Sequence, residues 1–413
     1  MPLIAPRRLA GPGATAVVWG LDRPLHPGRS CSGFETARQI ECLASMMAAR
    51  FVFLFRTAGI LAIGGVGGSL AQWIGLPMPY LTGSLAFVAA FTIFRSRKGA
   101  RAVQFPPLLR MTFVAVIGTM IGATFTTDLL AVVPSLGLSM TAMVLFVVIA
   151  LAGNYALFRK LGRYDRTTAF FAAMPGGLVE AVSLGEQAGG DVRVLSVQHF
   201  ARIVLVVMIV PLLFLLWTGE TVGSASGQSF EQHAYRTVDI FVILMLAAAG
   251  MALGPRLRLP AAHMVGPLVL SAAAHVSGLV DLNSPAWLLN LAQLVVGSGL
   301  GSTFAGSTGR QLIRAFSLGA VSTVLMLALG IGFAMTLARF MLVPVDALFI
   351  SFAPGGVTEM GLIALSLGVS PVVVTCHHLF RIFVTVLVAG TIARKSRQRA
   401  SAGHGGSGDS IGR

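Results

Sequence analysis

The feature of this sequence that most limits its fold is a set of long stretches without any charged side chain. They run over Thr57–Phe94, Leu129–Phe158, Ala315–Ala338 and Met360–Phe380. A helix needs about 20 apolar residues to cross a bilayer. Only 11% of the 413 residues are charged, whereas a soluble protein carries about 25% charged residues. The sequence therefore predicts an all-α polytopic membrane protein that has the lipid bilayer as its main partner.

The net charge of +15 does not indicate a nucleic-acid partner. The arginines lie in short loops and at the chain ends, where the cytoplasmic loops of membrane proteins gather Lys and Arg. No basic stripe carries interleaved aromatic residues, so we expect no direct nucleic-acid contact. The sequence also shows no Ser–His–Asp order, no metalloprotease motif and no lysine after a glycine-rich loop. We therefore expect no enzyme activity, no catalytic residue and no cofactor.

The two ends of the chain differ in composition from its middle. Residues 1–50 are rich in Arg, Pro and Gly and hold no membrane span. They are either a disordered cytoplasmic tail or an over-extended start, with the true initiator near Met46 or Met47. Residues 395–413 are rich in Gly and Ser at their end, which predicts a flexible tail.

An internal duplication organises the chain between these ends. The block 175–202 matches 354–381 without a gap, at an offset of 179 residues. At the same offset, "GTMIGATF" (118–125) matches "GSGLGSTF" (297–304), and "LPMPYLTGSL" (76–85) matches "LPAAHMVGPL" (259–268) at an offset of 183. Three matching blocks in one order predict a tandem duplication. Its parts are membrane repeat 1 at 51–217, a connecting loop at 218–236 and membrane repeat 2 at 237–394.

Loop charge predicts that the two repeats are inverted. Basic residues follow the second and fourth spans of repeat 1, but the first and third spans of repeat 2. Under the positive-inside rule, both termini are cytoplasmic and the loop 218–236 lies outside. Each repeat then crosses an odd number of times, as five spans plus a broken or re-entrant Pro-Gly-Gly (PGG) segment would. The alternative is six full spans per repeat in parallel, which places the loop inside.

Each repeat carries a PGG sequence, a glutamate, and later a histidine and an arginine. The first set is Pro175, Gly176, Gly177, Glu180, His199 and Arg202, and the second is Pro354, Gly355, Gly356, Glu359, His378 and Arg381. Proline and paired glycines break a helix, and broken backbone at membrane depth survives only where protein or a water-filled cavity covers it. Ionisable residues in the bilayer mark functional sites by default. We interpret the two sets as one substrate-binding or transport site at the repeat interface, able to bind an anion or relay protons.

Two other interpretations of these polar residues exist. The first, a structural ion pair, stays open, and the second, a metal site, has little support. Glu180–Arg202 and Glu359–Arg381 could be neutralising pairs that only fix helix packing. "TCHH" (375–378) contains residue types that bind metals, but neighbouring residues on a helix diverge by about 100°. The matching stretch of repeat 1 is "SVQH", and we expect no metal site.

Several of these motifs resemble a known family. "LPMPYLTGSL", the GxxxGxxF pattern and "MPGGLVEAVSLGEQAGGDVRVLSVQHFARI" (174–203), with their copies, are similar to the AbrB membrane family over about residues 55–393. Its members contain a duplicated AbrB domain and are often provisionally named ammonia monooxygenases. In repeat 2, Ser370 and His377 stand where repeat 1 has Asp191 and Gln198. The resemblance implies a role in regulation of gene expression, but not the compact β-rich domain of the DNA-binding regulators that share the family's name.

The sequence thus predicts a protein of the bacterial inner (plasma) membrane that acts as a secondary transporter of a small solute, with an anion favoured. The alternative is a membrane sensor or regulator that works through a partner protein. Both a homo-oligomer and a regulatory partner stay open.

The predicted orientation can be tested at the loop 218–236. A cysteine introduced by Ser226→Cys should react with a membrane-impermeant thiol reagent added to intact cells, because this loop is expected outside. The unmodified protein gives the background from its own cysteines. Reaction only after permeabilisation would favour six spans per repeat.

Overall fold

The computed structural model describes residues 36–98, 105–125, 136–218, 235–257, 259, 261–305 and 308–404. Over these residues the chain forms fourteen helices and no strand, which confirms the all-α prediction. The chain divides into two compact units, Met1–Ala58 and Gly59–Arg413. The helix packing that positions the candidate site lies within the second unit.

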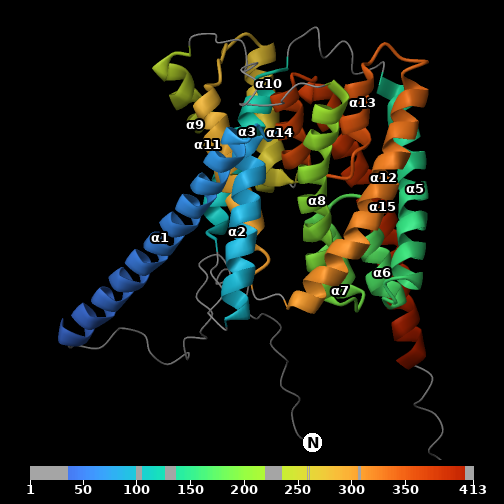
Figure 1. Ribbon diagram of the computed structural model, residues 1–413, viewed down its shortest axis with the longest axis horizontal. Helices are drawn as coiled ribbons and strands as arrows, with labels where there is room; N and C mark the ends of the chain where they lie inside the picture. Colours follow the sequence, from blue (N-terminus) through green and yellow to red (C-terminus); the bar gives the residue numbers. More distant parts are fainter. Residues whose placement is uncertain are drawn as a thin grey trace, which may run out of the picture. The chain divides into compact units, whose positions relative to one another are not determined.

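The helices follow the expected order in both repeats (Figure 1). Those of repeat 1 are α1 (Thr36–Trp73), α2 (Pro79–Arg97), α3 (Pro107–Gly122), α5 (Gly137–Lys160), α6 (Arg166–Ala173), α7 (Leu178–Gln187) and α8 (Val192–Thr218). Those of repeat 2 are α9 (Thr237–Arg256), α10 (Ala262–Val276), α11 (Ala286–Ser302), α12 (Gly309–Leu337), α13 (Val345–Phe352), α14 (Val357–Leu367) and α15 (Pro371–His404). Among the described residues, six helices are long and apolar enough to cross a membrane, namely α1, α5, α8, α9, α12 and α15. These six occupy equivalent places in the two repeats, as a duplicated membrane protein requires.

Both predicted tails contain helix in part. Helix α1 begins at Thr36, inside the segment expected to be a tail, and α15 continues to His404. The rest of the two tails, residues 1–35 and 405–413, lies outside the described residues. Of the connecting loop 218–236, the structure describes residues 218, 235 and 236.

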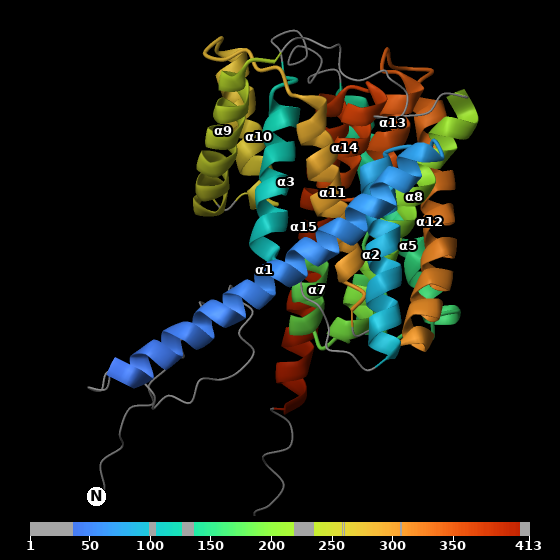
Figure 2. The same cartoon turned by 60° about the vertical axis from the view of Figure 1, so that its left-hand side comes forward.

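The helices of the second unit group into two bundles, each built from both repeats (Figures 1 and 2). The glycine bundle consists of the second half of α1 with α2, α3, α9, α10 and α11; in it α3 packs on α10 and α2 on α11. The crossover bundle consists of α5 to α8 and α12 to α15; in it α8 packs on α12 and α5 on α15. The two bundles meet chiefly where α14 lies on α3 and where α2 lies on α8.

Small residues allow the close helix approaches in the glycine bundle. A Cβ atom at Gly118 would collide with the carbonyl oxygen of Met264 on α10, and one at Gly297 would lie 2.5 Å from the carbonyl oxygen of Leu81 on α2. These two contacts are repeat equivalents, at offsets of 179 for the glycines and 183 for their partners. The matching sequence blocks therefore pack across the repeats, with glycine where one backbone meets another.

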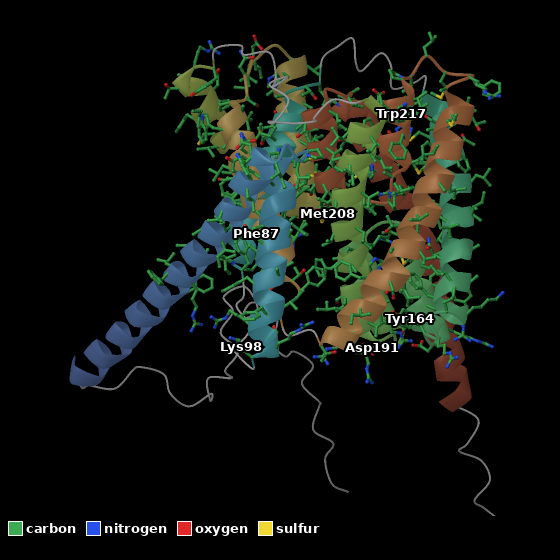
Figure 3. The ribbon with its side chains drawn as sticks, in the orientation of Figure 1. Phe87, Lys98, Tyr164, Asp191, Met208 and Trp217 are labelled. Atoms are coloured by element: carbon green, nitrogen blue, oxygen red, sulfur yellow. The ribbon has the colours of Figure 1, made fainter. Side chains whose placement is uncertain are left out.

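The end of α2, the loop after α5 and the start of α12, which carry basic residues, lie at one end of the second unit. Lys98, Tyr164 and Asp191 lie at this end, which we call the basic end, and Trp217 lies at the other (Figure 3). Arg314, near the start of α12, donates to the carbonyl oxygen of Gly162 and covers the ring of Tyr164 at 5.1 Å. The loop after α5 and the start of α12 therefore meet, as the alternating loop charge suggests.

The two broken segments lie toward opposite ends of the unit. Helices α6 and α7 are at the basic end, and α13 and α14 are at the other end (Figures 1 and 2). Tyr164 and Asp191, which flank α6 and α7, lie at the same end (Figure 3). This arrangement agrees with a segment that enters and leaves on one side. The inverted repeats and the re-entrant topology themselves stay predictions.

The glycine packing can be tested on neighbouring glycines of α1. A Cβ at Gly67 would lie 2.5 Å from the carbonyl oxygen of Gly83 and 2.7 Å from Phe87, whereas one at Gly65 meets nothing within 4 Å. We expect Gly67→Ala to destabilise the protein by about 1–3 kcal/mol through overpacking. Gly65→Ala should be neutral or stabilise the helix by up to about 1 kcal/mol. Thermal unfolding in detergent measures both, and equal effects would contradict this packing.

Candidate functional site

Each PGG sequence separates two short helices. Helix α6 ends at Ala173 before α7 begins, and α13 ends at Phe352 before α14 begins. Gly177 enters α7 with φ of 66°, a left-handed conformation that glycine adopts without steric cost. The last carbonyl groups of α6 and α13 have no partner within their own helices. Because lipid cannot supply a donor, other parts of the protein must.

In repeat 1, a histidine and an arginine of α8 supply these donors. Arg202 Nη1 donates to the carbonyl oxygen of Met174 at 2.6 Å, and His199 Nε2 lies 3.0 Å from that of Phe171. Arg202 Nη2 lies 3.1 Å from His199 Nδ1. Since arginine can only donate, Nδ1 accepts and the imidazole proton sits on Nε2, where it reaches Phe171. The pair thus binds α8 to the end of α6.

Repeat 2 contains the same arrangement. Arg381 donates through Nη1 to the carbonyl oxygen of Ala353 at 2.6 Å and through Nη2 to that of Gly355. Arg381 Nη2 also lies 2.7 Å from His378 Nδ1, and His378 Nε2 lies 3.0 Å from the carbonyl oxygen of Ile350. A positive charge beside the last carbonyl groups of a helix is also stabilised by the negative end of the helix dipole.

The two glutamates lie at the other side of each break, in the first turns of α7 and α14. A Cβ at Gly177 would lie 3.1 Å from Glu180 Oε2, and the Glu359 carboxylate lies against Gly356 in the same way. A carboxylate there is stabilised by the positive end of the helix dipole. In the described part of the chain, the ion pair found within 4 Å is Arg236–Asp239. The hypothesis of Glu180–Arg202 and Glu359–Arg381 pairs is therefore wrong, because each charge pairs with a helix end instead.

The two breaks meet at the boundary between the repeats. A Cβ at Gly176 would lie 3.3 Å from Arg381 Nε, and the carbonyl oxygen of nearby Met174 accepts from Arg202, so both guanidinium groups lie against the break of repeat 1. The two arginine side chains are 6% and 0% exposed, and the Nε–H group of each lacks an acceptor. Two like charges, each with an unused donor, are costly to bury unless an anion compensates them.

A further charged residue, Arg110, lies on α3, the helix of the glycine bundle that packs on α14. Its Cδ lies 3.1 Å from the Cβ position of Gly299 on α11. The repeat 2 equivalent of Arg110 is Leu289, so this charge is present in one repeat alone.

Gln198 and His377, which are repeat equivalents, each bind a helix of the opposite repeat. Gln198 Nε2 donates to the carbonyl oxygen of Ala315 at 3.2 Å, and Gln198 Oε1 accepts from Tyr164 at 3.1 Å. His377 Nε2 lies 2.9 Å from Ser139 Oγ, and Nδ1 lies 2.7 Å from a carbonyl of its own helix. The ring nitrogens of His377 are thus engaged in joining the repeats.

The assignment of Arg381 as a helix cap makes a prediction that differs from ion pairing. Arg381→Gln should destabilise the protein by about 1–3 kcal/mol, because buried carbonyl groups lose their donor. Adding Glu359→Gln should not restore stability, and the two effects should be additive within about 0.5 kcal/mol. Thermal unfolding and membrane protein level measure both. Recovery in the double variant would restore the ion-pair hypothesis.

Comparison with known proteins gives matches over most of the chain. A family model described as "Transition state regulatory protein AbrB" matches residues 93–397. "Putative regulator AbrB" of Escherichia coli (strain K12) is 23% identical over 295 residues, which cover 71% of this chain and 84% of that protein. "Uncharacterized protein YhjN" of Bacillus subtilis (strain 168) is 24% identical over 350 residues, covering 81% and 91%. Because the family model spans most of its length, this chain belongs to the AbrB family.

Proposed function

We propose that this membrane protein is a secondary transporter of a small anionic solute. The observation that carries the proposal is the pair of buried arginines, Arg202 and Arg381, one from each repeat. Both lie against the break of repeat 1, have no carboxylate partner within 4 Å in the described chain, and have an unused Nε–H group. An anion between them would accept both hydrogen bonds and compensate the two charges. Transporters commonly bind their solute at broken helices between repeats.

The chemistry of the arginines suggests which solutes fit. Their Nη groups are engaged by backbone and histidine, so the solute would meet one donor from each guanidinium. A carboxylate or another compact oxyanion has acceptor atoms for both donors. Glu180 and Glu359 lie at the same breaks and are candidates for the coupling proton or cation. The proposed activity moves the solute without converting it, so no enzyme function is invoked.

The proposed location is the inner (plasma) membrane, with both termini and the basic end in the cytoplasm. Basic residues of the loop after α2, the loop after α5 and the start of α12 support this orientation. This orientation is compatible with a homo-oligomer and with a regulatory partner that binds outside the bilayer.

A membrane sensor is the second candidate. The relative from Escherichia coli is named as a regulator, and the same pair of arginines could detect an anion without moving it. A sensor would change gene expression through a partner protein and would give no flux in purified form.

The experiment begins with untargeted comparison of metabolites in cells that lack or overproduce the protein, which presumes no solute. Purified protein in liposomes should then move the anion that this comparison identifies, or collapse an imposed proton gradient. Glu180→Gln and Glu359→Gln should each abolish flux at near-normal protein level. Glu186→Gln, at an exposed position of α7, is the matched control and should retain flux.

Two results would contradict the proposal. Absence of flux, with an expression change that depends on a co-purifying partner, would favour the sensor. Full activity in the double variants Glu180→Gln/Arg202→Gln and Glu359→Gln/Arg381→Gln would show that both PGG sequences are packing features only.

A further inference from the structure

Helices α7 and α14 are repeat equivalents, but the structure packs them differently. Nine of the eleven residues of α14 are buried. In α7, Glu180, Val182 and Leu184 are half-buried, and Ser183 and Glu186 are exposed. Two copies of one ancestral segment therefore have unequal surroundings.

The cover over α14 comes from the glycine bundle. A Cβ at Gly361 would lie 2.5 Å from Ile121 Cδ1 on α3 and 3.5 Å from Met264 Cε on α10. Thr358 Oγ1 donates to Met264 Sδ at 3.3 Å. Residues of α14 belong to the same apolar cluster as those of α3, α10 and α11. Helix α14 is thus docked on the glycine bundle.

The equivalent docking of α7 is missing from its main contacts. At the offset of 179, Val182 corresponds to Gly361 and Leu300 on α11 corresponds to Ile121. Helix α7 packs mainly on α6, α8 and α15. Val182 lies at the edge of a separate apolar cluster with Phe171 and Leu195, whereas Leu300 is in the cluster that contains α14. The repeats therefore differ in how the helix after each break contacts the glycine bundle.

We infer that the structure is one of two alternating states of the transporter. In the other state, α7 docks on the glycine bundle through Val182 and Leu300, and α14 leaves it as Gly361 and Ile121 separate. The inference rests on the proposed transport function, and exchange of two unequal repeat conformations is the simplest motion that an inverted duplication allows. The small contact between the bundles makes such a movement feasible.

The positions of α7 and α14 predict toward which side of the membrane the site opens in this state. Helix α7 lies at the basic end and α14 at the opposite end (Figures 1 and 2). Undocked α7 then marks the basic end as the side toward which the site would open, while in this state the Nε atoms of both arginines are still shielded from solvent. The polar residues of α7, with Glu180, Ser183 and Glu186 where α14 has Glu359, Leu362 and Leu365, suit a surface that contacts water.

Cysteine pairs in a background without the native cysteines test the exchange in proteoliposomes. Ile121→Cys with Gly361→Cys should crosslink with a short thiol reagent in the resting protein. Val182→Cys with Leu300→Cys should crosslink at least threefold more when an anion gradient drives turnover. Each crosslink should lower flux at least tenfold, and reduction should restore it. Gly153→Cys with Leu325→Cys is the matched control, because a Cβ at Gly153 would lie 3.2 Å from Leu325 Cδ2 within the crossover bundle; its crosslink should leave flux intact.

The outcomes separate this inference from the proposed function. Flux without any crosslink between the second pair overturns the exchange and leaves transport standing. Both pairs crosslinked in one molecule at once also overturns it, because the asymmetry would then not mark two states. If each molecule forms one crosslink or the other but no anion is transported, the motion is supported and transport is rejected.

Discussion

The carbonyl groups at the ends of α6 and α13, which lose their helical donors where the chain breaks, are the constraint on which the rest of the site depends. Lipid offers them no donor, so α8 and α15 must bring an arginine and a histidine to each break. This requirement fixes α8 beside α6 and α15 beside α13. It also places two positive charges deep in the crossover bundle. The charges are there because the backbone is broken, and their availability to a solute follows from that first role.

Structural and functional roles are divided between atoms of the same guanidinium. The Nη groups of Arg202 and Arg381 hold carbonyl oxygens and the neighbouring histidines, while both Nε–H groups lack an acceptor. The histidines engage both ring nitrogens in the same network and so orient the arginines, which argues against their acting as free proton carriers in this state. A glutamate at the start of each following helix balances the opposite dipole end. Charge at the breaks is therefore matched to helix ends, and the two Nε–H groups are the donors left for the proposed solute.

Much of the fold was readable from the sequence because its signals are local. Apolar stretches and prolines marked the helices, as at Pro79 and Pro107, where α2 and α3 begin. The PGG sequences located both breaks. The sequence did not reveal which groups the charged residues contact. Opposite charge favoured Glu–Arg pairs, whereas in the structure the arginines bind backbone carbonyl groups at the helix ends. The packing of α3, which carries Arg110, on α14, which carries Glu359, joins the two repeats, and no local pattern encodes it. The helical extensions at Thr36 and His404 lie in segments whose composition predicted tails.

The predicted duplication explains why the two halves resemble each other, but the proposed vectorial transport requires that they be unequal at any instant. Two features show the inequality here. Arg110 stands where repeat 2 has Leu289, and α14 is docked on the glycine bundle where α7 is not. The first is fixed by sequence and persists in every state. The second is a packing difference between segments that end alike, because a left-handed glycine follows each helix, Gly189 and Gly368. The breaks themselves differ: Gly177 before α7 is left-handed, with φ of 66°, whereas Gly356 before α14 is extended, with φ of −79°. Unequal docking is thus accompanied by a different torsion at the glycine of the break, which is where a hinge would absorb the proposed exchange.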